Sequence, residues 1–536
     1  MNQSFFRSTL TITLFAPLAR YLIVIPATVA MLVMAAIPGR AAAHQHHHYK
    51  LIEVATFGGP NFITNFIGLQ NSLLSKSGRL VGGADTPVVD PFCFDGQDCF
   101  VEHAFDFHDG VLTDLGALPG GANSQAFWIS SQGLIVGMAQ NGAVDPLLGI
   151  QSLHAVAWKD GRIIELGSLG GNESLSQAVN ERGQIVGIAL NAIPDPISLI
   201  GPVGTQMRAF LWENGVMRDL GTLGGPDAWA IYINDRGQVA GGSFTNSVIN
   251  PATGRPTTHP FLWEHGEMMD LGTVGGSFAN PEGINNQGEV VGEVTLPGDP
   301  GCNGSPDNCE FRAFVWERDS LKDIGTLGGS QASALGVNDS GEVVGTASNE
   351  NDQAFLAFVW KKGVMTSLGA SRGSDCSIAR AINSRGQIVG PSFPCVGAGS
   401  ENATLWEKGS AIDLNTFVPP GVDLHLTGDD IYINDRGDIA GTAVRSNGDV
   451  RAFLLIPCDE NHPNIEGCDY SPMEVSTVAA SHAAETAAHR KLTPQEISRI
   501  RALMMNRHRG FMPRLLGSVR QRITQIGAKA RPSGAS

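Results

Sequence analysis

The chain has 536 residues, of which 66 are glycine, and only 16% of its residues are charged. This turn-rich composition is closer to an all-β repeat protein than to a helical enzyme. The formal net charge is −16, yet residues 490–536 carry eleven Lys or Arg residues against one Glu. The remaining body is strongly acidic, so we do not expect it to bind nucleic acid.

The first 43 residues have the pattern of an export signal. Arg7 precedes an apolar run, the segment Tyr21–Gly39 carries no charge apart from its flanks, and the alanines ending at Ala43 suit signal-peptidase cleavage. An uncleaved membrane anchor is the alternative, because the apolar span approaches the length that crosses a bilayer.

Residues 44–50 follow as a His-rich leader. If cleavage occurs after Ala43, the new amino terminus with His44 and His46 forms a weak candidate site for Cu²⁺ or Ni²⁺. A disordered polar leader is the competing interpretation.

A unit of four short strands recurs through residues 51–457. In one copy "RAFLW" (Arg208–Trp212) alternates in polarity, and Asn214 with Gly215 forms a two-residue hairpin turn. "VMRDLGTL" follows, then "AIYIN" (Ala230–Asn234), a turn ending at Gly237, and "QVAGGS". The recurrence predicts a repeat architecture.

A glycine closes the fourth strand of eight units: Gly82, Gly137, Gly187, Gly241, Gly292, Gly345, Gly390 and Gly441. The chain lacks a first strand before Gly82 and has only a first strand after Gly441, so the two end fragments complete one unit. Sharing a unit closes a ring and removes sheet edges, which predicts an all-β, eight-bladed propeller of four-stranded blades with a short C-terminal helical tail. Seven blades result if the weak copy around Asp413 merges with its neighbour, and a β-solenoid is the alternative fold.

The turn Asn-x-x-Gly connects two strands in six units, and Ser75 and Ser130 replace the asparagine in the two earliest ones. Asn suits the first turn position and Gly accepts the positive φ that closes it. We therefore interpret these asparagines as turn formers and not as catalytic amides.

The motifs "HAFDF", "RAFLW" and "RAFVW", followed by variants of "DLGTLGG" and "IN..GQVVG", resemble the HAF-type extracellular repeat family. The resemblance covers about residues 50–457. It implies an exported, propeller-like repeat protein of bacteria and brings no established catalytic residues. Phe107 and Leu455, where other units have Trp, and the degraded "SLGASRGSD" depart from the pattern.

Two further residue types keep one position in the repeat. One is a tryptophan, which we expect to pack between blades instead of binding sugar rings: Trp158, Trp212, Trp263, Trp316, Trp360 and Trp406. The other is a carboxylate, which either lines a central channel and holds cations or accepts backbone N–H bonds within its own blade: Glu53, Asp114, Glu165, Asp219, Asp270, Asp323 and Asp413. Identical placement in seven units favours the structural role.

The most variable segments connect a fourth strand to the next first strand, and we expect them on one side of the ring. They span residues 83–102, 138–153, 188–207, 242–258, 293–311, 346–355, 391–402 and 442–450. Five acidic residues there are candidate ligands, with Ca²⁺ as a candidate ion and a plain solvated loop as the alternative: Asp85, Asp95, Asp98, Asp299 and Asp307.

Eight cysteines form four pairs that are close in sequence, which predicts disulfides in an exported chain: Cys93 with Cys99, Cys302 with Cys309, Cys376 with Cys395, and Cys458 with Cys468. Zinc is the alternative, but no pair has the Cys-x-x-Cys spacing.

After a linker over residues 458–489, the tail 490–536 is basic and amphipathic. Thr493, Pro494 and Glu496 predict a helix start with a capping box, and Leu515, Val519 and Ile523 mark a second amphipathic helix. Such a tail docks on anionic lipid, on nucleic acid or on the acidic body, or it is solvated.

The sequence contains no H-E-x-x-H, G-x-S-x-G or P-loop motif, so it names no catalytic residue and requires no cofactor. We expect a non-catalytic, exported binding protein whose partner is an extracellular or cell-surface protein or glycan. The alternatives are an extracellular hydrolase or lyase of propeller type and a structural envelope component held by its tail.

Overall fold

The computed structural model describes residues 45–500, apart from 64–71, 91–98, 146–150, 199–203, 299–308, 397–398, 475–490, 494 and 498. The chain divides into two compact units, Met1–Ala42 and Ala43–Ser536. The first unit, which holds most of the predicted signal segment, lies outside the described residues.

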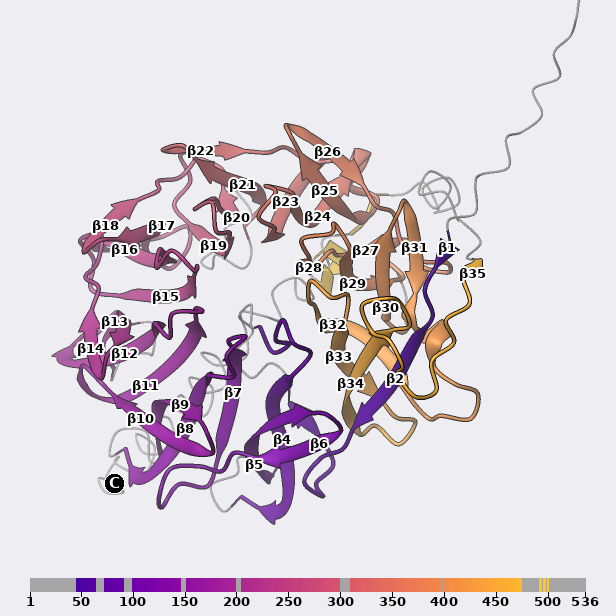
Figure 1. The fold of residues 1–536 in the computed structure, drawn as a ribbon. Helices are drawn as coiled ribbons and strands as arrows, with labels where there is room; N and C mark the ends of the chain where they lie inside the picture. The colour runs from indigo at the N-terminus through magenta and orange to yellow at the C-terminus, as the bar shows by residue number, and fades with distance from the viewer. Residues whose placement is uncertain are drawn as a thin grey trace, which may run out of the picture. The chain divides into compact units, whose positions relative to one another are not determined.

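The second unit is an eight-bladed β-propeller. Its eight sheets are antiparallel and are arranged as a ring, with the first strand of each sheet nearest the centre (Figure 1). Blades 1 to 4 consist of β3 (Phe62–Ile63), β4 (Leu80–Val89), β5 (Phe100–His108) and β6 (Val111–Asp114); β7 (Ser124–Ile129), β8 (Ile135–Val144), β9 (Gln151–Lys159) and β10 (Arg162–Gly167); β11 (Gly170–Val179), β12 (Ile185–Pro194), β13 (Thr205–Glu213) and β14 (Val216–Asp219); and β15 (Ala228–Ile233), β16 (Val239–Asn250), β17 (Arg255–Glu264) and β18 (Glu267–Asp270).

Blades 5 to 8 continue in the same order, except that blade 7 has a split innermost strand and blade 8 takes its outermost strand from the start of the chain. They consist of β19 (Ala279–Ile284), β20 (Val290–Thr295), β21 (Phe311–Glu317) and β22 (Ser320–Asp323); β23 (Gly328–Val337), β24 (Val343–Asn349), β25 (Phe355–Lys361) and β26 (Val364–Ser367); β27 (Cys376–Ser377) with β28 (Ala381–Ile382), β29 (Ile388–Phe393), β30 (Asn402–Glu407) and β31 (Ser410–Asp413); and β32 (His425–Ile433), β33 (Ile439–Val444), β34 (Val450–Pro457) and β2 (Tyr49–Val54).

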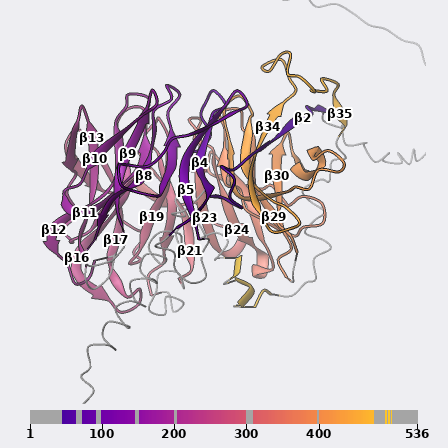
Figure 2. The same ribbon diagram turned by 90° about the horizontal axis from the view of Figure 1, so that it is seen from below.

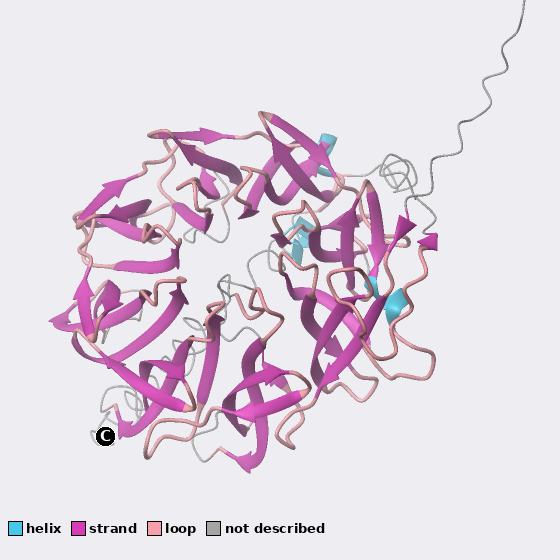
Figure 3. Ribbon diagram, in the orientation of Figure 1, coloured by secondary structure: helices cyan, strands magenta, loops and turns pink. Residues whose placement is uncertain are grey.

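Two short strands and two 3₁₀ turns stand outside the blades. Strands β1 (Gln45–His46) and β35 (Met473–Glu474) pair with each other, and the 3₁₀ turns η2 (Glu350–Asp352) and η3 (Leu414–Phe417) follow β24 and β31. Figure 3 shows how little helix the described residues contain. No helix in this part of the chain has the length and apolar character needed to cross a bilayer.

Blade 8 closes the ring by pairing the two ends of the repeat region. Strand β2 pairs antiparallel with β34, from Tyr49 opposite Pro457 to Val54 opposite Ala452. This confirms the predicted shared unit, and a closed ring excludes the β-solenoid. The weak copy around Asp413 supplies β30 and β31 of blade 7, so the count is eight and not seven.

Each sequence repeat straddles two blades. "RAFLW" and "VMRD" are the two outer strands of blade 3, whereas "AIYI" and "VAGG" are the two inner strands of blade 4. The predicted strand "VMRDLGTL" was too long, because the strand ends at Asp219. Gly221 and Gly224 have φ of 90° and 114°, a left-handed backbone that ends the extended run and leads to the next blade.

The core lies between neighbouring blades, where the recurrent aromatic residues are buried. Trp158, Trp263, Trp316 and Trp406 are at most 8% exposed, in agreement with a packing role. The recurrent glycine makes room for a ring: a Cβ at Gly241 would lie 2.0 Å from the Trp229 carbonyl oxygen and 2.7 Å from the Phe261 ring. Close packing of this kind explains why the glycine returns in every unit.

Candidate functional site

The Asn-x-x-Gly turns form the most regular polar structure of the molecule. In the turn of blade 4, Asn234 Oδ1 accepts the N–H of Arg236 and that of Gln238, both at 3.0 Å. Gly237 N–H donates to the Asn234 carbonyl oxygen at 3.0 Å with a φ of 85°. These contacts are those of the predicted turn former.

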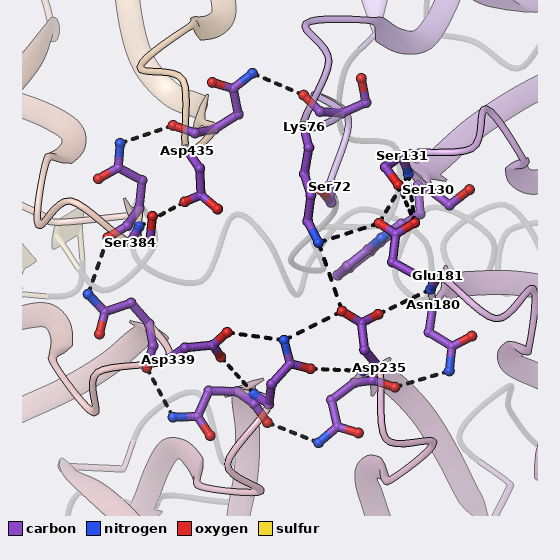
Figure 4. Close-up of a pocket in the computed structure, with 18 of the residues that line it drawn as sticks. Ser72, Lys76, Ser130, Ser131, Asn180, Glu181, Asp235, Asp339, Ser384 and Asp435 are labelled. Atoms are coloured by element: carbon purple, nitrogen blue, oxygen red, sulfur yellow. Dashed lines mark hydrogen bonds and ion pairs between the residues drawn. The ribbon is translucent and has the colours of Figure 1, made fainter.

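The same asparagines also connect the blades. Each Nδ2 donates to the main-chain oxygen of the equivalent turn residue in the next blade, at 2.9 to 3.2 Å (Figure 4). The donor and acceptor pairs are Asn180 with Asn234, Asn234 with Asn285, Asn285 with Asn338, Asn338 with Asn383, Asn383 with Asn434, and Asn434 with Ser75. The six bonds thus form a hydrogen-bonded arc that runs from blade 3 through blade 8 to blade 1 around one mouth of the central channel.

A second row of contacts surrounds a cavity of about 290 Å³ at this mouth. Here the residue after five of the six asparagines accepts an N–H bond from the preceding blade. Glu181 accepts from Ser131 at 3.1 Å, Asp235 accepts from Glu181 at 3.1 Å, and Asp435 accepts from Ser384 at 2.8 Å. Lys76 Nζ lies 3.5 Å from Glu181 and 3.8 Å from Asp235.

This mouth is acidic, but its carboxylates already have donors from the chain itself. Asp339 accepts both the Asn286 N–H and the Asn286 Nδ2 donor, at 2.8 and 3.1 Å. Backbone N–H groups and Lys76 therefore compensate the negative charge of these carboxylates, and the contacts hold neighbouring blades together. This second role was not predicted from the sequence. The recurrence of Asn where Asp could also start the turn was a signal, because only the amide can donate.

The recurrent carboxylates lie on the outer strands and not at the central cavity. Five of them bind a His or Arg on the third strand of the same blade: His103 with Asp114, His154 with Glu165, Arg208 with Asp219, His259 with Asp270, and Arg312 with Asp323. Glu53 binds Arg445 and Arg451 in blade 8, and Asp413 accepts the Asn415 N–H. All these contacts stay within one blade.

Asp270 shows the electrostatics of this position. Partial burial raises its pKa. Hydrogen bonds from His259, at 2.8 Å, and from the Gly272 N–H lower the pKa by more than burial raises it, so the net shift is downward. The carboxylate is held ionised at the start of the turn that leads to the next blade.

Glu173 is an unusual acid at the joint of blades 2 and 3. It is 6% exposed, and its Oε2 accepts the Leu153 N–H at 2.6 Å. Burial raises its pKa to about 8, although the Leu153 N–H lowers it. Because the Glu173 carboxyl group is enclosed between two blades and accepts an N–H from the neighbouring one, we interpret its role as joining the blades.

The opposite side of the ring carries the variable connections between the second and third strands of the blades. We call this surface, made of the eight segments 83–102 to 442–450 given above, the hairpin face. Antiparallel order requires the Asn turns and these hairpins to lie on opposite sides (Figure 2). The predicted placement of the connections on one side follows from this topology.

The candidate ligands on the hairpin face are mostly outside the described residues. Asp95, Asp98, Asp299 and Asp307 lie there. Asp85 is only 1% exposed, and its carboxylate accepts the Asn61 N–H at 2.9 Å, so it is enclosed in blade 1 and not on the surface.

Branched aliphatic residues are exposed on the hairpin face instead. They stand at the ends of β4, β8, β12 and β16 in four consecutive blades, and Val248 and Val89 are 73% and 65% exposed. The group, which we call the aliphatic tips, consists of Val88, Val89, Val144, Ile193, Val248 and Ile249.

Disulfides reinforce the same side and the closing blade. Cys376 bonds to Cys395 and Cys458 bonds to Cys468. Cys99 and Cys309 are also disulfide-bonded, with predicted partners, Cys93 and Cys302, outside the described residues.

The described part of the leader offers no free ligand set. His46 is 2% exposed, and its Nδ1 lies 3.0 Å from Glu407 Oε2, whereas His44 lies outside the described residues. Within the described ranges no group of three or more His, Cys, Asp or Glu residues is placed to hold a metal ion.

Comparison with known proteins gives only distant likenesses. No protein-family model matches the chain, and no curated protein does. The β-propeller domain of the trilobed protease from Pyrococcus furiosus aligns at 9% identity over 63% of this chain and 95% of that one, with a TM-score of 0.37. TolB from Acinetobacter baumannii aligns at 10% identity over 56% and 76%, with a TM-score of 0.28. The HAF-type resemblance therefore rests on its motifs, and the eight-bladed fold rests on the strand pairing.

Proposed function

We propose that this protein is an exported, non-catalytic binding protein whose hairpin face binds a basic, amphipathic segment of a partner protein. The observation that carries the proposal is the row of aliphatic tips on four consecutive blades. Valine and isoleucine are not the residues that turn chemistry selects, and water disfavours their exposure. Clustered exposed apolar side chains mark interaction surfaces.

The charge of the hairpin face supports a basic partner. Its eight segments contain 15 Asp or Glu residues and only two basic residues, Arg255 and Arg445. Six of these acids are buried and do not face a partner: Asp85, Glu102, Asp145, Asp195, Glu293 and Asp352. A partner with apolar and cationic sides would bury the tips and meet this charge. Export is supported by the disulfides, which persist in oxidising compartments.

The binding test uses the full chain and a fluorescent 20-residue amphipathic helix of Leu, Lys and Ala. Anisotropy at 50 and 300 mM NaCl reports the Kd, and we expect binding to weaken with salt. Serine in place of Val88, Val144, Ile193 and Val248 should weaken binding at least tenfold, because the buried apolar area is lost.

Two controls make the result specific. A peptide of the same composition with scrambled order keeps the charge and loses the apolar side, and a variant with Val111→Ser and Val216→Ser changes exposed valines on β6 and β14. Equal affinity of the tip variant and the native chain, or equal affinity for the scrambled peptide, would overturn the proposal. Tight binding of a glycan panel instead would favour a carbohydrate ligand.

A further inference from the structure

The described start of the C-terminal tail is anchored on the hairpin face. Leu492 and Ile500 are 3% and 1% exposed and belong to one hydrophobic cluster with Phe355, Phe393 and the Cys395 end of a disulfide. This places the described start of the tail at blades 6 and 7.

Polar contacts fix the anchor. The Leu492 N–H donates to the Asp352 carbonyl oxygen at 3.2 Å, and Lys491 Nζ lies 3.6 Å from Asp352 Oδ2. A capping box then starts a short helix over 495–497 and 499–500: the Thr493 N–H donates to Glu496 at 2.8 Å, and the Glu496 N–H donates to Thr493 Oγ1 at 3.3 Å. Lys491, near the start of the tail, therefore already meets an acidic residue of the hairpin face.

The 36 residues beyond Ile500 match that face in composition. They contain eight Lys or Arg residues and no Asp or Glu, and Leu515, Val519 and Ile523 recur at helical spacing. Even as a continuous helix such a segment spans about 54 Å, which exceeds the diameter of a small domain. It starts on the same side of the ring as the aliphatic tips, because Leu492 contacts Asp352 of the hairpin face.

We propose that residues 501–536 fold back over the hairpin face and cover the aliphatic tips of blades 1 to 4, with their basic side chains on its carboxylates. On the proposed function above, the tail then occupies the binding surface until a partner displaces it. Its own propeller is favoured over an anionic membrane because the anchor holds the tail beside the face at a high effective concentration.

Hydrogen–deuterium exchange of the full chain tests this contact without any partner. Native protein is compared with a variant that carries Arg514→Gln, Arg520→Gln, Arg522→Gln, Leu515→Ser and Val519→Ser. We expect the amides around Val144, Ile193 and Val248 to exchange about tenfold faster in the variant, because they lose their cover. A matched control with Lys159→Gln, Arg162→Gln and Arg218→Gln removes the same charge from exposed sites at the other ends of the strands and should leave exchange there unchanged.

A second measurement adds the synthetic peptide 501–536 and vesicles containing phosphatidylserine. If the tail is docked, the full chain should bind vesicles at least tenfold more weakly than the peptide does. Unchanged exchange in the tail variant, or equal vesicle binding by the chain and the peptide, would show that the tail is free and overturn the inference. The exchange measurement needs no ligand. It therefore tests the docking of the tail even if the Leu-Lys-Ala peptide does not bind and the proposed function is wrong.

Discussion

Asn434 Nδ2 donates to the main-chain oxygen of Ser75, 3.0 Å away and 359 residues earlier in the chain. This bond joins the turns of blades 8 and 1, and β2 completes blade 8 by strand pairing with β34. Two independent sets of hydrogen bonds thus join the ends of the repeat region, one at the centre of the ring and one at its outer edge.

Replacing Asn434 by Asp should weaken this closure. The carboxylate has nearly the same shape but cannot donate, so the Ser75 oxygen keeps only the Gly78 N–H as a donor and stands beside a new negative charge. We expect the free energy of unfolding, measured in urea, to fall by about 1–3 kcal/mol. Asn447→Asp serves as the control, since Asn447 is exposed and its Oδ1 acts as an acceptor for the Asp449 N–H. Equal losses in the two variants would contradict a closing role.

Glu173 predicts a stability that falls as pH rises. Its pKa is about 8 in the folded protein against a usual value of 4.5, so the folded state holds a proton that the unfolded state has released. Stability is complete below pH 4.5 and is lost as pH rises toward 8, by at most about 4 kcal/mol. Glu173→Gln keeps the acceptor for the Leu153 N–H and cannot ionise.

Thermal unfolding at pH 5 and pH 8 measures this effect. The native chain should lose stability between the two values, whereas Glu173→Gln should lose much less and should be the more stable protein at pH 8. Glu267→Gln, on the exposed end of β18, should follow the native chain at both values. Parallel profiles for all three proteins would exclude a buried, protonated Glu173.

The fold was largely predictable because its information is repeated. The glycines from Gly82 to Gly441 mark eight units, and the split unit at the two ends specifies closure. The closed ring could therefore be predicted without knowing which distant residues are in contact. The strand after Asn214-Gly215 was overextended because hydrophobic alternation continues past Asp219, whereas the backbone at Gly221 ends it. Local pattern and backbone conformation disagree there, and only the structure decides.

The polar sites were predictable only where they are local. Asp270 and His259 are eleven residues apart and meet within one hairpin. The bond from Asn234 to Asn285 spans 51 residues and joins two blades, so its existence depends on how neighbouring blades stand. The exposure of the aliphatic tips and the burial of Leu492 and Ile500 likewise depend on which surfaces of the folded protein face water. A local sequence pattern does not specify this.

Ile500→Ala should release the tail from the ring. The side chain is 1% exposed within the cluster around Phe355 and Phe393, and its truncation should cost about 2–4 kcal/mol. Because cleavage of a locally open segment follows the population of the open form, trypsin should cut after Arg499 at least about tenfold faster. Val111→Ala, at an exposed valine of β6, is the control and should leave that rate unchanged. If Ile500→Ala is cleaved at the rate of the native chain, the Ile500 side chain does not hold the start of the tail on the ring.

His462 should be the strongest single contact outside the repeats. Its side chain is fully buried, and its two ring nitrogens lie 2.9 Å from Asp438 and 2.8 Å from Asp459. Burial raises the pKa of Asp459. Hydrogen bonds, that from His462 first among them, lower this pKa by more than burial raises it, so the net shift of the pKa is downward. His462→Asn removes the imidazole that both buried carboxylates contact, and we expect a loss of about 3–5 kcal/mol at pH 7.

The pH dependence separates this electrostatic loss from a packing defect. A lowered folded pKa means that Asp459 stabilises the native chain above the usual Asp pKa of 3.8, and that this contribution disappears as the pH falls below it. The difference between native chain and His462→Asn, measured by urea unfolding, should therefore be full at pH 7 and shrink below about pH 4. His265→Asn, at an exposed turn position, should stay within about 0.5 kcal/mol of the native chain throughout. A difference that does not change with pH would mean that the imidazole acts by filling space, because a packing loss does not titrate.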